Sequence, residues 1–226
     1  MSARLKGLVP GSEPDKTRDA LVRVALDRFG ANGFEATSTR EISTAAGANI
    51  AAIAYHFGGK EGLRKACAEY VASLIGRKLG PVLGGVAANA PLGRDDALAQ
   101  LSRAFEAMID FVVVSPEAEP IARFMLREMT QPSPAFDLIH DGAMAPMHEG
   151  LCLLWARATG GKPGSEATRL ATLATIAQAL YFRIARRVVL RRLDWGDIGP
   201  TQAAAIKRVL LRNLHASIEA ARRAPS

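Results

Sequence analysis

Residues 37–63 read TSTREISTAAGANIAAIAYHFGGKEGL, and this stretch decides the fold. Ser38 stands three residues before Glu41, the spacing of a capping box, in which the two side chains bond each other's backbone amides and start a helix. Gly47 can adopt the left-handed conformation that ends this short helix, and Asn49 can cap a second one. Two helices joined by so short a turn predict a helix-turn-helix, whose second helix enters the major groove of DNA.

Helix starts on both sides of this second helix offer phosphate-binding chemistry. Lys60 lies in the first turn of the following helix, where free backbone amides and the helix dipole favour an anion. Thr39 and Arg40 occupy the first turn of the preceding helix. Two such starts suit the two phosphate backbones that border a groove. The alternative interpretation is an ordinary helical hairpin, because small helices with a glycine between them are common.

The run from Lys16 through Tyr70 resembles the DNA-binding domain of the TetR (tetracycline-repressor-type) family. The FxxxGFxxTSxxEI and YHFxxKExL stretches occur at that family's spacing. The resemblance implies an all-helical homodimer that regulates transcription, usually a repressor that a small-molecule effector releases from a palindromic operator. Within the family, ANIAAIAYHFGGKEGL and the later FMLREMTQPSPAFD are similar to the subgroup of the cefoperazone and chloramphenicol sensitivity regulator.

The resemblance assigns DNA contacts position by position. It implies phosphate contacts for Thr39, Tyr55, His56 and Lys60, and groove-facing roles for Asn49, Ile50, Ala51 and Ala52. The chain departs from the family pattern at residues 49, 50 and 54, where members often have Ser-Lys and an aromatic residue. Because the side chains of residues 50–52 can meet only a thymine methyl, Asn49 is the candidate for adenine and Arg40 the best candidate for guanine.

Composition and charge agree with this interpretation. The chain has 226 residues, of which 49% are hydrophobic, and a formal net charge of +7. This length supports one large or two small domains with a sizeable core, and the charge assists association with DNA through counterion release. Two cysteines far apart in the sequence argue against a disulfide framework. Without a signal-peptide pattern or an apolar run of about 20 residues, we predict a cytoplasmic protein that is not in a membrane.

Helical periodicity continues along the whole chain, so the predicted fold is all-α with about nine helices. We expect a flexible N-terminal arm over residues 1–14, a three-helix helix-turn-helix DNA-binding domain over 15–59, a connecting helix over 60–81, and a larger effector-binding and dimerisation domain over 82–226. Arg4 and Lys6 on the arm could touch the minor groove, although a disordered tail is the favoured interpretation. Pro146, inside a helix predicted over 135–159, should bend it.

The last two predicted helices, over residues 166–193 and 200–223, each carry an apolar stripe. The stripe residues are Leu173, Ala177, Leu180, Ile184 and Val188 on the first, and Ile206, Val209, Leu210, Leu214 and Ile218 on the second. Because both helices are long and come last, we interpret the stripes as a four-helix dimer interface, which the family resemblance also implies. Alternatively, each stripe faces the rest of its own domain.

An effector pocket is expected between the two regions. Candidate lining residues are Phe105, Met108, Phe111, Phe124, Met125, Arg127, Glu128, Met144, Met147 and Trp155. Methionine suits a pocket that accepts varied apolar compounds, although plain core is the alternative for most of these residues. Arg127 and Glu128 stand in an apolar stretch and need partners, which are either the polar end of an effector or a structural salt bridge.

Three remaining interpretations concern metal binding and other functions. His140, Met144, His148 and Cys152 recur every four residues on one helical face, and soft transition metals accept such ligands. The four span about 18 Å at 1.5 Å per residue, so one ion cannot bind them all, and we predict no metal or cofactor. An enzyme using His140 or His148 lacks a supporting nucleophile or phosphate motif, so we predict that the protein is not an enzyme. The other alternative is a helical dimer that binds small molecules without specific DNA binding.

Overall fold

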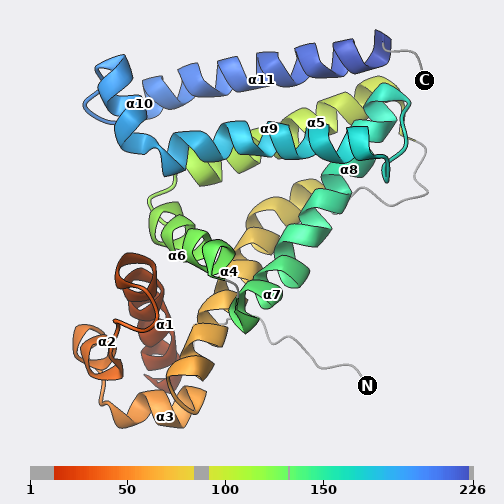
Figure 1. Cartoon of the computed structure of the whole chain (residues 1–226). Helices are drawn as coiled ribbons and strands as arrows, with labels where there is room; N and C mark the ends of the chain where they lie inside the picture. The colour runs from red at the N-terminus through yellow and green to blue at the C-terminus, as the bar shows by residue number, and fades with distance from the viewer. Residues whose placement is uncertain (1–12, 84–91, 132, 224–226) are drawn as a thin grey trace, which may run out of the picture.

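The computed structural model describes residues 13–83, 92–131 and 133–223, which are almost entirely helical (Figure 1). The α-helices of this part are α1 (Glu13–Asn32), α2 (Thr39–Ala45), α3 (Ala51–Phe57), α4 (Lys60–Leu83), α5 (Arg94–Ile109), α6 (Ala118–Thr130), α7 (Pro134–Ile139), α8 (Ala145–Thr159), α9 (Glu166–Ile184), α10 (Arg186–Leu193) and α11 (Pro200–Arg223). Two π-helical segments, η1 (Asp110–Val114) and η2 (His140–Met144), follow α5 and α7. The all-α prediction is confirmed.

The predicted N-terminal arm only partly matches this structure. Helix α1 begins at Glu13, inside the predicted arm. Arg4 and Lys6 lie outside the described residues. Among the described residues, no helix combines the length and the apolar character that crossing a bilayer requires.

Two helices that the sequence predicts as continuous are interrupted. In the first, η2 separates α7 from α8, and Pro146 lies in the first turn of α8. Proline has no N–H to donate and its ring clashes with the carbonyl group four residues earlier, so a wider π turn directly upstream accommodates it. The helix predicted over 166–193 divides into α9 and α10 at Ala185, whose backbone has φ −96° and ψ 25°. These interruptions explain why the helices outnumber the prediction.

The molecule has a small bundle of α1, α2 and α3 at one end, from which α4 leads into the remaining helices (Figure 1). Helix α6 packs against α1 and so lies between the small bundle and the rest. Helices α5, α8, α9 and α11 pack against one another at the opposite end. Helix α6 is therefore placed to connect events in the larger region with the position of the small bundle.

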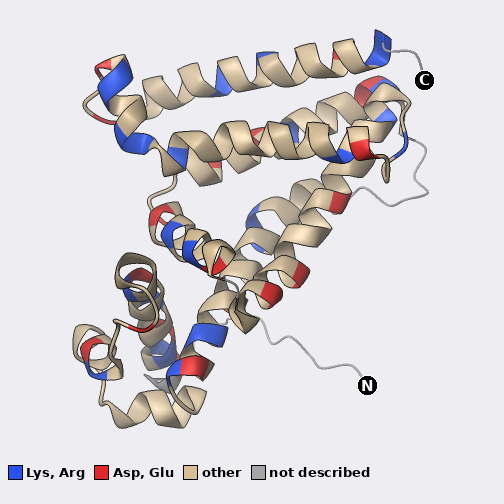
Figure 2. Cartoon of the chain, viewed as in Figure 1, with Lys and Arg blue, Asp and Glu red and all other residues tan. Residues whose placement is uncertain are grey.

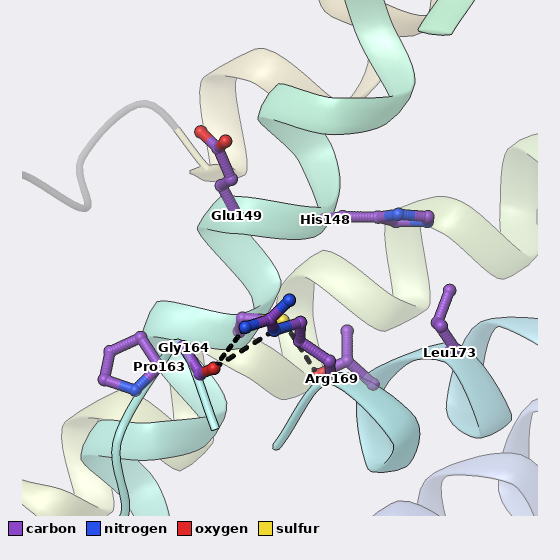
Figure 3. Close-up of a pocket in the computed structure, with 8 residues that line it drawn as sticks. His148, Glu149, Pro163, Gly164, Arg169 and Leu173 are labelled. Carbon is purple, nitrogen blue, oxygen red and sulfur yellow. Dashed lines mark hydrogen bonds between the residues drawn. The ribbon is translucent and has the colours of Figure 1, made fainter. Parts of the chain in front are cut away.

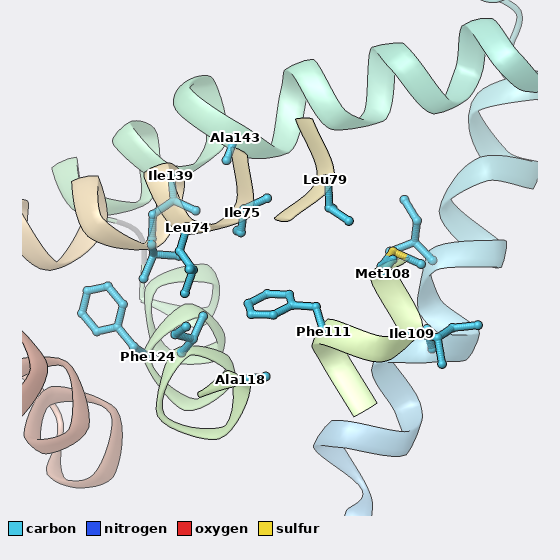
Figure 4. Packing of buried hydrophobic residues seen from close by; sticks show 14 of the residues in the cluster. Leu74, Ile75, Leu79, Met108, Ile109, Phe111, Ala118, Phe124, Ile139 and Ala143 are labelled. Atoms are coloured by element: carbon cyan, nitrogen blue, oxygen red, sulfur yellow. The ribbon is translucent and has the colours of Figure 1, made fainter. Parts of the chain in front are cut away.

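One hydrophobic core extends through both regions. Phe29 and Ile53 are buried in the small bundle, and Leu74 on α4 is buried in the larger region. Figure 4 shows Phe111 of η1 pointing toward the side of α4 that carries Leu74, with Phe124 of α6 nearby. Burial of such a side chain contributes about 1.5–3 kcal/mol. Beyond the small bundle, α4 packs mainly against α5, α7, η2 and α8.

Candidate nucleic-acid interface

Helices α2 and α3 form the helix-turn-helix that the sequence predicts. Ser38 has an extended backbone, and its Oγ accepts from the amide of Glu41 at 3.1 Å. Gly47 has φ +65° in the turn, and Asn49 Oδ1 accepts from the amide of Ala51 at 2.9 Å. The helix start at Ser38 and the glycine turn are therefore confirmed, although the Glu41 carboxylate pairs with Arg28 at 3.4 Å instead of completing the capping box. Asn49 caps the first amide of α3 from one residue further back than expected, because Ile50 directly precedes the helix.

The cap changes what Asn49 can offer to a base. Recognition of adenine by asparagine is bidentate and uses both the side-chain oxygen and the side-chain amine. The oxygen of Asn49 already accepts from the backbone of Ala51. A bidentate contact must therefore share or break this cap. Arg40, which is exposed on α2, is the better candidate for base recognition.

Helix α3 presents an exposed and neutral surface. Tyr55 is 84% exposed and Ile50, just before the helix, is 51% exposed. Ala51 is exposed as well, whereas Ala52 and His56 are partly buried. Figure 2 shows no Lys, Arg, Asp or Glu on α3, whose last turn carries His56. The exposure of Ile50 and Ala51 agrees with the predicted groove-facing roles, but Ala52 also packs against the core.

Two helix starts flank this surface. Thr39 is the first residue of α2, and Lys60 is the first residue of α4. The Lys60 ammonium lies 4.4 Å from the centre of the Phe34 ring and 3.4 Å from the carbonyl oxygen of Glu35. A cation–π contact therefore holds this charge at the end of α4 where the helix dipole favours an anion. Helix α3 therefore lies between two helix starts, of which the second carries the Lys60 ammonium.

Gly62 is a functional residue that the sequence analysis did not identify. A Cβ at this position would lie 1.7 Å from the carbonyl oxygen of Phe57, the last residue of α3. Only glycine permits α3 and α4 to approach so closely, and Gly58, with φ +72°, turns the chain between them. The sequence does contain a sign of this role, because Gly62 stands in the first turn of a helix, where glycine is usually unfavourable.

Helix α6 binds the end of α1 through close backbone approach and arginine side chains. A Cβ on Gly30 would lie 3.0 Å from a backbone nitrogen of α6. Arg127 donates to the carbonyl oxygens of Gly30 and Ala31 at 2.8 and 2.7 Å. Arg123 pairs with Asp27 of α1 at 2.9 Å. These contacts, together with those of α6 to α4, are called the α6 junction below.

On α4, the junction contains a buried ion pair. Glu128 is 3% exposed and accepts from Arg64 Nε at 2.9 Å and Nη2 at 2.8 Å. The hydroxyl of Ser133 donates to the same carboxylate, and the Arg64 guanidinium lies 4.6 Å from the centre of the Phe34 ring. Glu128 therefore has the structural salt bridge that the sequence allowed, whereas Arg127 donates to backbone carbonyl oxygens of α1 instead of to a carboxylate. Neither residue lines a hollow found among the described residues.

Most of the predicted effector-lining residues form core. Phe105, Met108, Phe111, Phe124 and Trp155 are buried, and Met125, Met144 and Met147 are partly buried. Only Phe105 and Trp155 line a hollow found among the described residues, and it offers about 10 Å³, less than one water molecule needs. Apolar periodicity does not distinguish a pocket from a core, and an effector-lining role for these residues stays a prediction.

A larger hollow, of about 380 Å³, lies between α8 and the start of α9 (Figure 3). His148 and Cys152 line it, and Cys152 donates to Thr172 Oγ1 at 3.5 Å. Burial, followed by the charge of His140, lowers the pKa of His148. His140 itself does not line the hollow, and its Nδ1 lies 2.8 Å from Asp141. In the part of the chain that is described, no three His, Cys, Asp or Glu side chains are grouped to hold a metal.

The two predicted dimer stripes differ in exposure. On α9, Leu173 and Ile184 are 48% and 53% exposed, Ala177 is exposed and Leu180 is partly buried, and Val188 on α10 is 58% exposed. On α11, Ile206, Leu210, Leu214 and Ile218 are at most 3% exposed, and Val209 is 41% exposed. The expectation for α11 is thus corrected: its stripe packs on α5, α8 and α9 of the same chain, and only Val209 faces outward.

Comparison with known proteins decides the family. Residues 21–67 match the family described as "Bacterial regulatory proteins, tetR family", and residues 97–221 match "HTH-type transcriptional dual regulator CecR, C-terminal domain". The dual regulator CecR of Shigella flexneri is 34% identical over 184 residues, which are 80% of this chain and 82% of that protein. The chain belongs to the TetR family. It is a transcriptional regulator with a helix-turn-helix DNA-binding domain and a C-terminal domain of the CecR type.

Other proteins share shorter stretches of sequence or the fold. RaaS of Mycobacterium tuberculosis is 47% identical over 62 residues, 27% of this chain and 29% of that protein. A transcriptional regulator from Pseudomonas aeruginosa PAO1 has a TM-score of 0.65 at 21% identity, covering 95% of this chain and 96% of its own. AibR, solved with isovaleryl coenzyme A and operator DNA, has a TM-score of 0.65 at 15% identity, covering 86% and 96%. At these identities the solved structures show the fold alone.

Proposed function

We propose that this TetR-family regulator is a cytoplasmic repressor that binds a palindromic operator as a homodimer and leaves it when a small-molecule effector binds. The observation that carries the proposal is α3, an exposed helix without charge that is framed by cationic residues at two helix starts. Its seven residues span about 10 Å, which fits the major groove of about 12 Å. DNA binding, and not catalysis, is the function that this surface supports.

Each side chain of the interface has a role in the proposal. Thr39, Tyr55, His56 and Lys60 contact phosphates, Arg40 and Asn49 contact bases, and Ile50, Ala51 and Ala52 contact thymine methyl groups. Few of these groups can hydrogen-bond to bases. Operator choice therefore depends strongly on the separation of the two α3 helices in the dimer, which must match grooves about 34–36 Å apart.

Exposed apolar residues on α9 and α10 support the homodimer. Leu170 and Tyr181 extend the stripe of Leu173, Ile184 and Val188, and both are more than half exposed. A contiguous apolar surface of this kind typically marks an association site. Leu173→Glu should convert the dimer to a monomer in sedimentation velocity. Met129→Glu, which changes a partly exposed methionine on α6, should leave the dimer intact, and a wild-type protein that sediments as a monomer would contradict the dimer.

The α6 junction offers a route from effector to DNA. Helix α6 is bonded to α1 through Arg127 and to α4 through Glu128, and these two helices carry the recognition unit. An effector that prefers a different position of α6 changes the separation of the two α3 helices. By linkage, the effector then binds less tightly when operator is present.

Selection of bound fragments from genomic DNA, followed by a salt series, tests the proposal. We expect one partly palindromic sequence to be enriched. Lys60→Ala should weaken binding to every sequence and reduce the salt slope by about 1, whereas Arg40→Ala should change which bases are preferred. Arg77→Ala, an exposed arginine farther along α4, is the matched control and should change neither. Failure to enrich any sequence would favour a small-molecule-binding dimer without specific DNA binding.

A further inference from the structure

The ring of Phe34, in the loop between α1 and α2, lies against two cations of α4. The Lys60 ammonium is 4.4 Å from the centre of this ring, and the Arg64 guanidinium is 4.6 Å from it. Lys60 and Arg64 are four residues apart, so both project from the same face of α4. The negative face of an aromatic ring attracts cations at such distances. Two positive charges of α4 therefore share one ring.

The Lys60 ammonium keeps most of its hydrogen-bonding capacity. Among the described residues it has one acceptor, the carbonyl oxygen of Glu35 at 3.4 Å, and no carboxylate pairs with it. An ammonium group has three donors, so two remain for phosphate oxygens. A lysine side chain loses much rotamer freedom when a ligand fixes it. A ring that already holds the ammonium lowers this entropic cost of binding DNA.

A second cation on the same ring requires compensation, because like charges four residues apart on a helix repel. Glu128 of α6 supplies this compensation. Its carboxylate is buried and accepts from Arg64 Nε at 2.9 Å and Nη2 at 2.8 Å. A bidentate pair of this kind offsets the charge of Arg64, whereas Lys60 has no such partner in the described part of the chain. Lys60 is thus the cation on the ring whose charge is available to DNA.

We propose that Phe34 is the positioning residue for the phosphate contact of Lys60, and that Glu128 keeps Lys60 on the ring by offsetting the charge of Arg64. Helix α6 thereby acts on a DNA contact through the side chains of Glu128, Arg64 and Phe34. A movement of α6 that separates Glu128 from Arg64 leaves two uncompensated charges on one ring and displaces the Lys60 ammonium. The phosphate contact rests on the proposed function, whereas the arrangement on the ring does not.

NMR spectroscopy of methylated lysines tests the arrangement without DNA. Reductive methylation of the full chain with ¹³C-formaldehyde places labelled methyl groups on each lysine and keeps its positive charge. The ring current of Phe34 should separate the Lys60 methyl signal from that of Lys65, an exposed lysine on the same helix. Lys60→Arg and Lys65→Arg assign the two signals. In Phe34→Leu the two should coincide, and coincident signals already in the wild type would overturn the ring contact.

The same signal tests the role of Glu128. Glu128→Gln keeps the shape of the side chain and removes its charge, so the Lys60 signal should move toward the position of the Lys65 signal. Glu61→Gln is the matched control, because it removes an exposed carboxylate that is adjacent to Lys60 in the sequence, and it should leave the signal in place. Spectra are compared at a temperature where circular dichroism shows all variants folded. An unchanged Lys60 signal in Glu128→Gln would overturn this role.

Fluorescence anisotropy with an enriched DNA fragment tests the positioning role. The analogue 3,4,5-trifluorophenylalanine keeps the shape of phenylalanine but removes most of the negative charge from the ring face. At position 34 it should weaken binding by about fourfold or more, because the freed ammonium must be ordered again in each subunit of the dimer, at about twofold or more each. The salt slope should stay as in the wild type, since the Lys60 charge remains, whereas Lys60→Ala reduces it.

The matched control carries the same analogue at Phe29, whose ring lies 5.4 Å from that of Phe34 and has no Lys or Arg over it among the described residues. It should bind as the wild type does. Unchanged or tighter binding of the Phe34 analogue would overturn the positioning role, and so would a reduced salt slope, because the analogue retains every charge. Failure to enrich any fragment would remove the phosphate contact along with the proposed function, while the NMR signals decide the ring arrangement separately.

Discussion

The recognition helix and the α6 junction are built from opposite kinds of side chain. Helix α3 is exposed and carries no charged residue, so it has little means of making directional bonds to bases. The junction contains a buried ion pair, arginine bonds to the end of α1 and a close backbone approach at Gly30. The difference indicates that hydrogen bonds and ion pairs in this chain serve mainly to position the recognition helix, and less to recognise bases. Changes in the junction should therefore alter DNA binding without any contact with DNA.

The largest expected effect follows from breaking the buried ion pair. Arg64→Met keeps an apolar stem beside Phe34 and leaves Glu128 buried without its partner. Loss of one partner of a buried pair costs about 3–5 kcal/mol, so the free energy of unfolding in urea should fall by about that amount. The double variant Arg64→Met with Glu128→Leu should recover part of the loss.

The control for this variant is Arg77→Met, an exposed position on the same helix, where the change should stay within about 0.5 kcal/mol. A loss below about 1 kcal/mol for Arg64→Met would mean that the pair does not hold α6 to α4. The α6 junction would then lack the contact that we expect to be its most stabilising one.

A smaller effect is expected where α3 meets α4. In Gly62→Ala the new Cβ would lie 1.7 Å from the carbonyl oxygen of Phe57, so α3 must shift. Overpacking of this kind costs about 1–3 kcal/mol, and the displaced helix should lose affinity for an enriched fragment in fluorescence anisotropy. Gly76→Ala is the matched control because no atom lies within 4 Å of its Cβ position. Equal affinity of the two variants would show that the α3–α4 angle is not critical.

The smallest effect is expected at the start of α2. Ser38→Ala removes the cap to Glu41 and should lower the free energy of unfolding by about 1 kcal/mol in urea. Thr44→Ala, at an exposed site on the same helix, should leave stability equal or slightly higher, because alanine has the better helix propensity. Equal stability of Ser38→Ala and the wild type would show that the Ser38 cap does not stabilise the fold.

The helix-turn-helix was predictable because its signals are local. Ser38, Gly47 and Asn49 each act on backbone groups within three residues, so their spacing alone indicates where helices start and turn. The junction was not predictable in this way. Arg64 and Glu128 are 64 positions apart, and nothing in a single sequence pairs them.

The dimer stripes show a second limit of the sequence. The stripes on α9 and α11 have the same apolar periodicity, yet one is exposed and the other is buried within its own chain. Periodicity identifies which face of a helix avoids water, whereas the covering partner depends on tertiary packing. The same limit applies to the predicted effector pocket, most of which is core.

The affinity of Gly30→Ala for an enriched operator fragment tests the central claim most directly. Gly30 lies in α1, outside the helix-turn-helix, and a Cβ there would press on α6 at 3.0 to 3.2 Å. At a temperature where circular dichroism shows both variants folded, we predict that Gly30→Ala binds at least tenfold more weakly than the wild type. Gly80→Ala, whose Cβ position is open, should bind as the wild type does. Wild-type affinity for Gly30→Ala would contradict the claim that the α6 junction positions the recognition helix.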